Sequence, residues 1–87
     1  MLSEPMTLYK LMILYLLKQM NTALAEHRIT EFFLSREYTS YFTLRQALAE
    51  LCEAGLVLAN RTAYGSRYTA SPEGLETLSF FGKRLSR

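Results

Sequence analysis

The amino-acid sequence predicts a mainly α-helical fold that contains one small β-hairpin. Four segments carry the residue patterns and end signals of helices, and two short β-prone runs flank a stretch rich in turn-forming residues at 60–66. The predicted order is helix, short strand, helix, helix, strand, turn, strand, helix. Because the chain has 87 residues, we expect residues 1–87 to form one domain.

The central helix has the clearest signals, at 39–55. Thr39 or Ser40 can cap its first turn, because a short side-chain oxygen accepts a hydrogen bond from an amide that has no partner within the helix. Gly55 supplies the left-handed residue that commonly ends a helix. Between these ends one face is apolar and is expected to be buried, with Tyr41, Leu44, Ala47, Leu48 and Leu51.

Two helices are expected before the central one. Residues 6–20 are apolar around nearly the whole circumference, so this helix should be buried on more than one side, and the second side is most simply another subunit. A short strand at 22–24 and a turn at 37–38 bound the second helix, 27–36, whose start lacks a good capping residue. Residues 27–55 are therefore expected to form a helix-turn-helix.

A β-hairpin is predicted at 56–70, directly after the central helix. Its strands are expected at 56–59 and 67–70, joined by a seven-residue tip at 60–66 that contains the turn-forming residue Gly65. A helix-turn-helix followed by such a hairpin is a winged helix, and the hairpin is its wing.

The last helix is expected at 72–85. Ser71 can cap its first turn, and Pro72 suits the first helical position. Gly74 costs about 1 kcal/mol of helix propensity relative to alanine. Its presence therefore indicates that close packing requires a glycine.

Charge is distributed unevenly along the chain. The net charge of +2 is too small to identify a partner, but residues 58–87 hold five Lys/Arg and two Asp/Glu, a net of +3, whereas residues 1–57 hold five and six, a net of −1. The wing would explain this basic excess. We expect Arg61, Tyr64 and Arg67 to contact the backbone or the minor groove of DNA.

The exposed face of the central helix supplies further candidate DNA contacts. Its last two turns carry Glu50 and Glu53, whereas its first two turns carry side chains that suit bases and phosphates, as in a helix that presents its N-terminal end to a groove. Arg45 and Gln46 are expected to contact base edges. The remaining candidates are Ser40 and Thr43, for bases or phosphates, and Phe42, for a thymine methyl group.

The sequence argues against an enzyme and against a metal or cofactor site. It has no nucleophile with a nearby base and no Gly-rich phosphate loop. His27, the sole histidine, has Glu26 and Glu31 nearby, but Cys52 is distant in sequence, so a metal site is disfavoured. We expect His27 to be a surface residue that can contact a DNA phosphate alongside Arg28.

The single cysteine and the short apolar run at 11–17 indicate the cellular compartment in which we expect the protein. Cys52 cannot form an internal disulfide, and a reducing cytoplasm is the expected setting. Residues 11–17 are far too few to span a bilayer, which takes about 20 residues, so no membrane partner is expected. A signal peptide is disfavoured because Glu4 precedes the apolar run and cleavage would discard the first helix.

The order of elements resembles bacterial winged-helix transcriptional regulators of the MarR and PadR kind. The chain is most similar to an uncharacterised bacterial winged-helix family, a domain of unknown function. The resemblance spans most of the chain and implies a dimeric DNA-binding regulator. The matching residues are Thr30-Glu31-Phe32, Tyr38-Thr39, Tyr41-Phe42-Thr43-Leu44, Leu48, Leu51, Gly55-Leu56, Tyr68-Thr69 and Glu73-Gly74.

Two functions remain open at this point. The first is a sequence-specific transcriptional regulator that binds double-stranded DNA as a homodimer through the first and last helices. The second is a winged-helix module that binds protein rather than DNA, which Phe42, Glu50 and Glu53 on the outer face of the central helix favour.

Overall fold

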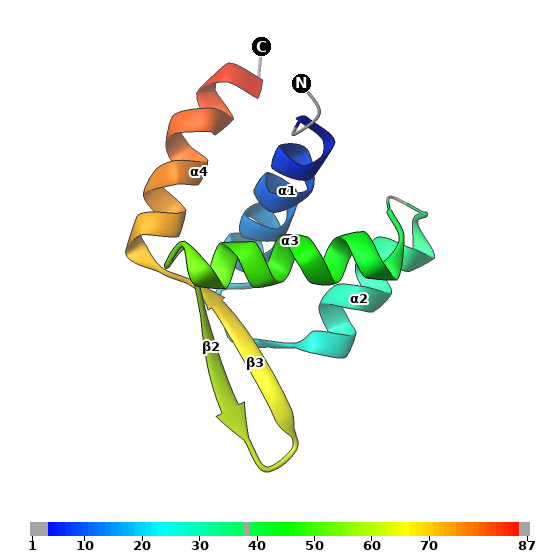
Figure 1. The fold of residues 1–87 in the computed structure, drawn as a ribbon. Coiled ribbons are helices and arrows are strands. Elements are labelled where there is room, and N and C mark those ends of the chain that lie inside the picture. Colours follow the sequence, from blue (N-terminus) through cyan, green and yellow to red (C-terminus); the bar gives the residue numbers. More distant parts are fainter. Residues whose placement is uncertain (1–3, 38, 86–87) are drawn as a thin grey trace.

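A computed structural model describes residues 4–37 and 39–85 and confirms the predicted fold class (Figure 1). The fold is a winged helix, in which helices cluster at one end and a hairpin extends from the other. Its elements are α1 (Glu4–Met20), β1 (Leu24–Ala25), α2 (Glu26–Ser35), α3 (Tyr41–Glu53), β2 (Val57–Thr62), β3 (Gly65–Ala70) and α4 (Pro72–Leu85).

The helix boundaries agree closely with those expected. α4 has the predicted bounds, α1 begins two residues earlier, and α2 runs one residue earlier at both ends. The weak start of α2 is also confirmed, because its capping residue Ala25 makes no side-chain cap hydrogen bond. In the turn before α3, Glu37 has a φ of 56°, and Tyr38 lies outside the described residues.

The small sheet is antiparallel and has the strand order β1-β3-β2. β1 is the predicted short strand, shifted toward Ala25, and it pairs with β3 through Leu24↔Tyr68 and Ala25↔Arg67. β2 pairs with β3 along its whole length, from Val57↔Ala70 to Thr62↔Gly65. β3 is thus paired on both edges at Arg67 and Tyr68, and toward the wing tip it pairs with β2 alone.

The prediction of a seven-residue wing tip is wrong. The two strands are longer than expected, and two residues, Ala63 and Tyr64, join them. Gly65 makes this possible with a φ of 120°. The Thr62 hydroxyl also stabilises the turn, since its Oγ1 accepts a hydrogen bond from the Tyr64 amide at 3.1 Å and donates one to the Gly65 carbonyl at 2.8 Å. Arg61 therefore lies in a strand rather than in a loop.

The core lies between α1 and the elements that surround it. α1 packs against α3, α4 and β3 and contributes Leu11, Ile13, Leu14 and Leu17. The predicted stripe of α3 is buried at Leu44, Ala47, Leu48 and Leu51. Tyr41 is an exception to the prediction: its side chain is 53% exposed, because it begins the helix at the margin of the buried face.

Further buried apolar residues from β1, α2, β2, β3 and α4 complete this core. They are Leu24, Ile29, Phe33, Val57, Tyr68 and Leu78.

The two ends of the wing meet at a buried junction around Ser71. Gly55 has the left-handed φ, 78°, that was predicted for the end of α3. The Ser71 hydroxyl donates to the Gly55 carbonyl at 2.6 Å and accepts from the Gly74 amide at 3.0 Å, so it caps α4 while it holds the end of α3. The Ser71 amide donates to the Leu56 carbonyl at 3.0 Å.

Gly74 is required by the close approach of α4 to this junction, as its position in a helix predicted. A Cβ atom at residue 74 would overlap the Leu56 carbonyl oxygen and lie 3.0 Å from its carbonyl carbon. The Leu56 carbonyl cannot move away easily, since it accepts the Ser71 amide. Glycine at this position lowers the helix propensity of α4 but allows its backbone to approach the backbone of Leu56 closely.

Gly74→Ala should destabilise the fold by about 1–3 kcal/mol, the usual cost of overpacking, even though alanine favours helix. Urea denaturation measures this loss as a lower midpoint with an unchanged slope. Ser79→Ala is the matched control, because Ser79 is exposed in the same helix and the change should have little effect. An unchanged midpoint for Gly74→Ala would contradict the close packing.

Candidate nucleic-acid interface

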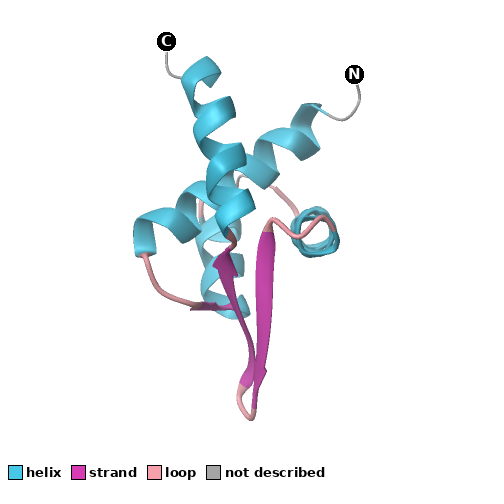
Figure 2. Ribbon diagram, turned by 90° about the vertical axis from the view of Figure 1, so that its left-hand side faces the viewer, coloured by secondary structure: helices cyan, strands magenta, loops and turns pink. Residues whose placement is uncertain are grey.

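α3 presents one exposed face, and the wing extends beyond the helices. In Figure 2, α3 is seen almost end-on at one margin of the molecule, and the hairpin extends away from the helices. One side of α3 is buried against α1, α2 and β2, and the opposite side faces outward. The residues expected to contact DNA are distributed over this outward side, the hairpin and α2.

The middle of the outward face of α3 is apolar and acidic rather than basic. Phe42 is 77% exposed, and Ala49 and Glu53 are also exposed. At 100° per residue Phe42 and Glu53 point most directly away from the buried stripe, and Ala49 and Gln46 flank them. Arg45 and Glu50 lie at opposite edges of the face. A groove facing α3 would therefore meet Phe42 first and the polar edges next.

Ser40, one of the two residues predicted to cap α3, is its N-terminal cap, and Thr43 is its hydrogen-bond partner. The Ser40 Oγ accepts the Thr43 amide at 3.2 Å and donates to the Thr43 Oγ1 at 3.0 Å. Both hydroxyls thus take part in the cap. A DNA contact from either side chain would share a group that already stabilises the start of the helix.

Arg45 forms an ion pair with Glu26, the first residue of α2. Its Nη1 donates to the Glu26 Oε2, and this hydrogen bond together with the charge of Glu26 raises the pKa of Arg45. Close to half of the Arg45 side chain is nevertheless exposed. This pair could not be predicted from the sequence, because the two residues are 19 positions apart and meet only when α2 packs on α3.

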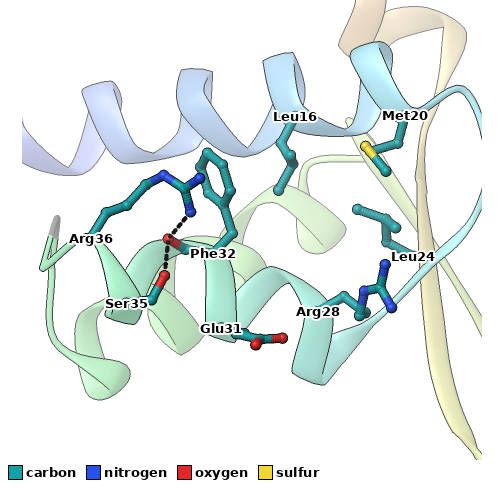
Figure 3. A pocket seen from close by; sticks show the side chains of 8 residues that line it. All are labelled: Leu16, Met20, Leu24, Arg28, Glu31, Phe32, Ser35 and Arg36. Carbon is teal, nitrogen blue, oxygen red and sulfur yellow. Dashed lines mark hydrogen bonds between the residues drawn. The ribbon is translucent and has the colours of Figure 1, made fainter.

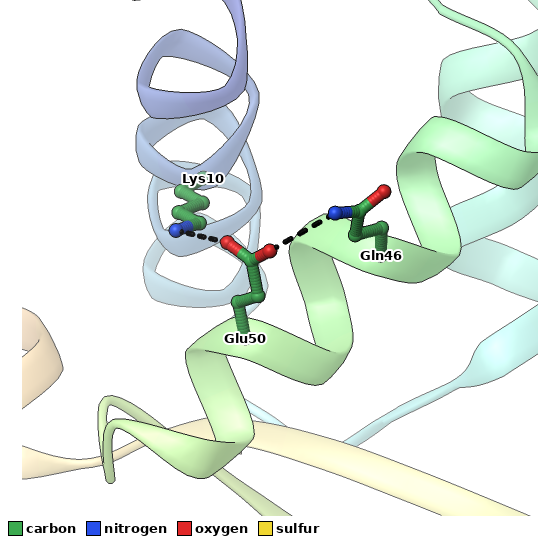
Figure 4. A network of polar contacts seen from close by, with 3 residues as sticks. All are labelled: Lys10, Gln46 and Glu50. Carbon is green, nitrogen blue, oxygen red and sulfur yellow. Dashed lines mark hydrogen bonds and ion pairs between the residues drawn. The ribbon is translucent and has the colours of Figure 1, made fainter. Parts of the chain in front are cut away.

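Gln46 belongs to a second polar network, which joins α3 to α1 (Figure 4). Its amide nitrogen donates to the Glu50 Oε2 at 3.2 Å, and the Lys10 Nζ lies 2.6 Å from the Glu50 Oε1. These hydrogen bonds, the one from Lys10 first, lower the pKa of Glu50. The charge of Glu50 is therefore offset by Lys10, a partner that sequence reasoning did not identify.

The wing places its two arginines on opposite faces of the hairpin. Side chains alternate along a strand, and residues paired across strands share a face. Arg61 pairs with Ser66 and so shares the face of the buried Tyr68, whereas Arg67 pairs with Asn60 on the other face. Both arginines are exposed, and neither forms an ion pair with an acid in the described part of the chain.

Tyr64 lies at the wing tip and is 96% exposed. It is one of the two residues that join the strands, so its ring extends beyond the last strand pair. The structure thus brings Arg61, Tyr64 and Arg67 together on one projecting hairpin.

Arg28 is separated from the other candidates. It lines a groove of about 250 Å³ between α1 and α2, beside Met20 and Leu24 (Figure 3). In the same groove, the Arg36 guanidinium lies 4.1 Å from the centre of the Phe32 ring and donates to the Phe32 carbonyl at 3.3 Å. Arg28 therefore faces α1 rather than α3, and the structure does not join it to Arg45 or the wing.

The polar residues discussed for other chemistry are dispersed. His27 is exposed on α2, and Cys52 is a partly buried free thiol whose pKa is raised by burial. Residues 4–37 and 39–85 contain no group of three His, Cys, Asp or Glu side chains that could hold a metal ion. Within the same ranges, no helix is both long and apolar enough to cross a membrane.

Comparison with protein families gives a match over residues 9–87 to the family described as Domain of unknown function (DUF4364). The chain belongs to this family. The matched range begins within α1 and includes α2, α3, the wing and α4, so the whole candidate interface lies inside the DUF4364 domain. Neither the curated proteins nor the solved structures give a significant match.

In this DUF4364 domain, Glu50→Gln should remove a stabilisation that exists only above acid pH. The pKa of Glu50 is lower in the folded than in the unfolded state, so the pair with Lys10 stabilises the fold above the unfolded-state pKa and is lost as the pH falls through the folded-state pKa. We expect a lower Tm than wild type at about pH 7 and the same Tm at about pH 2, measured by thermal unfolding.

Glu53→Gln is the matched control for this measurement, because Glu53 is exposed on α3 and has no ion pair within the described residues. It should leave the Tm nearly unchanged at both pH values. A deficit of Glu50→Gln that is as large at about pH 2 as at about pH 7 would rule out the Lys10 pair as its cause.

Proposed function

We propose that the protein is a DNA-binding transcriptional regulator that acts as a homodimer. The observation that carries the proposal is the wing: two exposed arginines without acidic partners in the described chain project on a hairpin beside an exposed helix. Phosphate contacts from such cations supply most of the affinity for DNA. The resemblance of the element order to MarR-like and PadR-like regulators supports the same function.

In the proposed complex, α3 enters the major groove with its N-terminal half. That half carries Arg45 and Gln46 for base edges and Phe42 for a thymine methyl group, while Glu53 lies toward the far end. The positive end of the helix dipole also favours this approach to phosphates. The wing then contacts the backbone or the adjacent minor groove through Arg61 and Arg67.

The homodimer is proposed from apolar side chains that the single chain leaves exposed. On α1, Leu8 and Tyr15 are exposed, although the same helix contributes four buried residues to the core. On α4, which packs against α1, Leu75, Phe80 and Phe81 are exposed. In the proposed dimer a second copy covers these residues, and the two α3 helices bind successive major grooves, which lie about 34 Å apart.

A second function is a protein-binding module. Phe42 favours it, because an aromatic ring that is 77% exposed in the middle of a face with Ala49 and Glu53 suits a protein surface as well as a groove. This module would show no binding to duplex DNA even at low salt.

Selection from a pool of random duplexes tests DNA binding and yields a preferred duplex for the measurements that follow. Affinity for that duplex should fall steeply as salt rises, and Arg61→Ala and Arg67→Ala should each reduce the slope of log K against log salt by about 1. Lys18→Ala is the matched control, since it removes an exposed cation on α1 and should leave the slope unchanged. No enrichment and no binding at low salt would refute the DNA function.

Tyr15→Glu should convert the dimer to a monomer, because it would bury a carboxylate in the proposed interface. Sedimentation equilibrium measures the change directly. Tyr64→Glu serves as the control, because Tyr64 is also an exposed tyrosine but lies at the wing tip. This variant should remain dimeric. Identical association of the two variants would exclude α1 from the interface.

A further inference from the structure

The ion pair between Glu26 and Arg45 lies where α2, α3 and the base of the wing meet. Glu26 begins α2 immediately after β1, and the preceding residue, Ala25, pairs with Arg67 of β3. Arg45 lies one turn inside α3. One carboxylate thus joins the start of α2 to the exposed helix, beside the strand that carries the wing.

Arg45 is the sole basic residue in the sequence of α3, Tyr41–Glu53, so its orientation matters for any contact with DNA. A guanidinium has five N–H donors in a planar fork, and the bond to Glu26 uses Nη1. With close to half of the side chain exposed, donors remain for a second acceptor. Such a fork suits the two acceptors on the major-groove edge of guanine.

We propose that Glu26 is a positioning residue that sets the sequence selectivity of DNA binding by holding Arg45 toward one base edge. The proposal rests on the DNA-binding function proposed above. Glu26 acts in two ways. It restricts the rotamers of Arg45, so less freedom is lost when a guanine is bound. Its negative charge also disfavours a phosphate beside Arg45, which penalises complexes in which Arg45 contacts the backbone instead.

A purely structural role would give a different result. Partly exposed ion pairs contribute little to stability, so removing this pair should change the Tm only slightly. If the pair merely joined α2 to α3, its loss would weaken binding to all duplexes alike. The ratio of affinities for preferred and scrambled duplexes therefore separates positioning from structure.

The test compares Glu26→Gln with Glu31→Gln at one salt concentration, using the duplex selected by the wild-type protein and a scrambled duplex. Both variants remove one negative charge from α2, but Glu31 has no ion pair within the described residues. Glu26→Gln should bind the scrambled duplex more tightly and reduce the ratio about tenfold, within the range expected for one bidentate base contact. Glu31→Gln should change both affinities by a similar factor and leave the ratio intact.

Two further variants make the assignment specific. Glu26→Asp keeps the charge but shortens the side chain, so it should lower the ratio without a change in net charge, and it replaces Glu26→Gln if that variant does not fold. In an Arg45→Ala background, Glu26→Gln should no longer alter the ratio, because its effect passes through Arg45. A remaining effect in that background would overturn the proposal.

The two levels of the proposal fail in distinguishable ways. If the wild-type protein prefers one duplex and Glu26→Gln behaves like Glu31→Gln, the role of Glu26 is wrong and the DNA function stands. If the wild-type protein prefers no duplex, the DNA function fails, and the role of Glu26 falls with it.

Discussion

The close contact between Gly74 and the Leu56 carbonyl is the constraint on which the geometry of the wing depends. At this point the chain leaves α3 and enters the wing, and close by in space, at Ser71, it leaves the wing and enters α4. Ser71 joins both passages, because its hydroxyl binds the Gly55 carbonyl and the Gly74 amide. Since the two ends of the hairpin are fixed to the end of α3, the wing cannot change direction without disturbing the core.

The features that could be predicted from the sequence were those with local causes. Gly55 ends its own helix and Ser71 caps the first turn of the helix that follows it, and the unfavourable Gly74 in a helix is itself a sign of a close approach. The start of α4 followed from the capping residue Ser71 and from Pro72 at the first helical position. The fold class, which depends on the order of such elements, was therefore within reach of the sequence.

The features that were missed depend on packing between distant elements. The length of the wing strands is set by the register of β2 and β3, and turn-forming residues alone suggested a longer tip than the two residues observed. Glu26 and Lys10 reach Arg45 and Glu50 only after α2 and α1 have packed against α3. The margin of a buried face is equally hard to place, as the exposed Tyr41 shows.

These two ion pairs change the electrostatic description of α3. The sequence gives the helix one basic and two acidic residues, but Arg45 is offset by Glu26 and Glu50 by Lys10. Of the charged residues of α3, Glu53 then has no ion pair with a described residue. It lies at the C-terminal end of the helix. In the proposed complex, long-range attraction for DNA would therefore come mainly from the wing, whose arginines have no ion pair with any described residue, while α3 would supply short-range discrimination.

The same pairs connect α3 to the rest of the molecule. Lys10 lies on α1, the helix that also presents the exposed Leu8 and Tyr15, and its bond to Glu50 crosses directly to α3. A dimer formed through α1 would therefore fix the position of each α3 relative to the symmetry axis through a packed helix and an ion pair, with no flexible segment between. That rigidity is what a protein needs in order to read two half-sites at a fixed spacing, because any freedom between the helices would let them bind at several spacings.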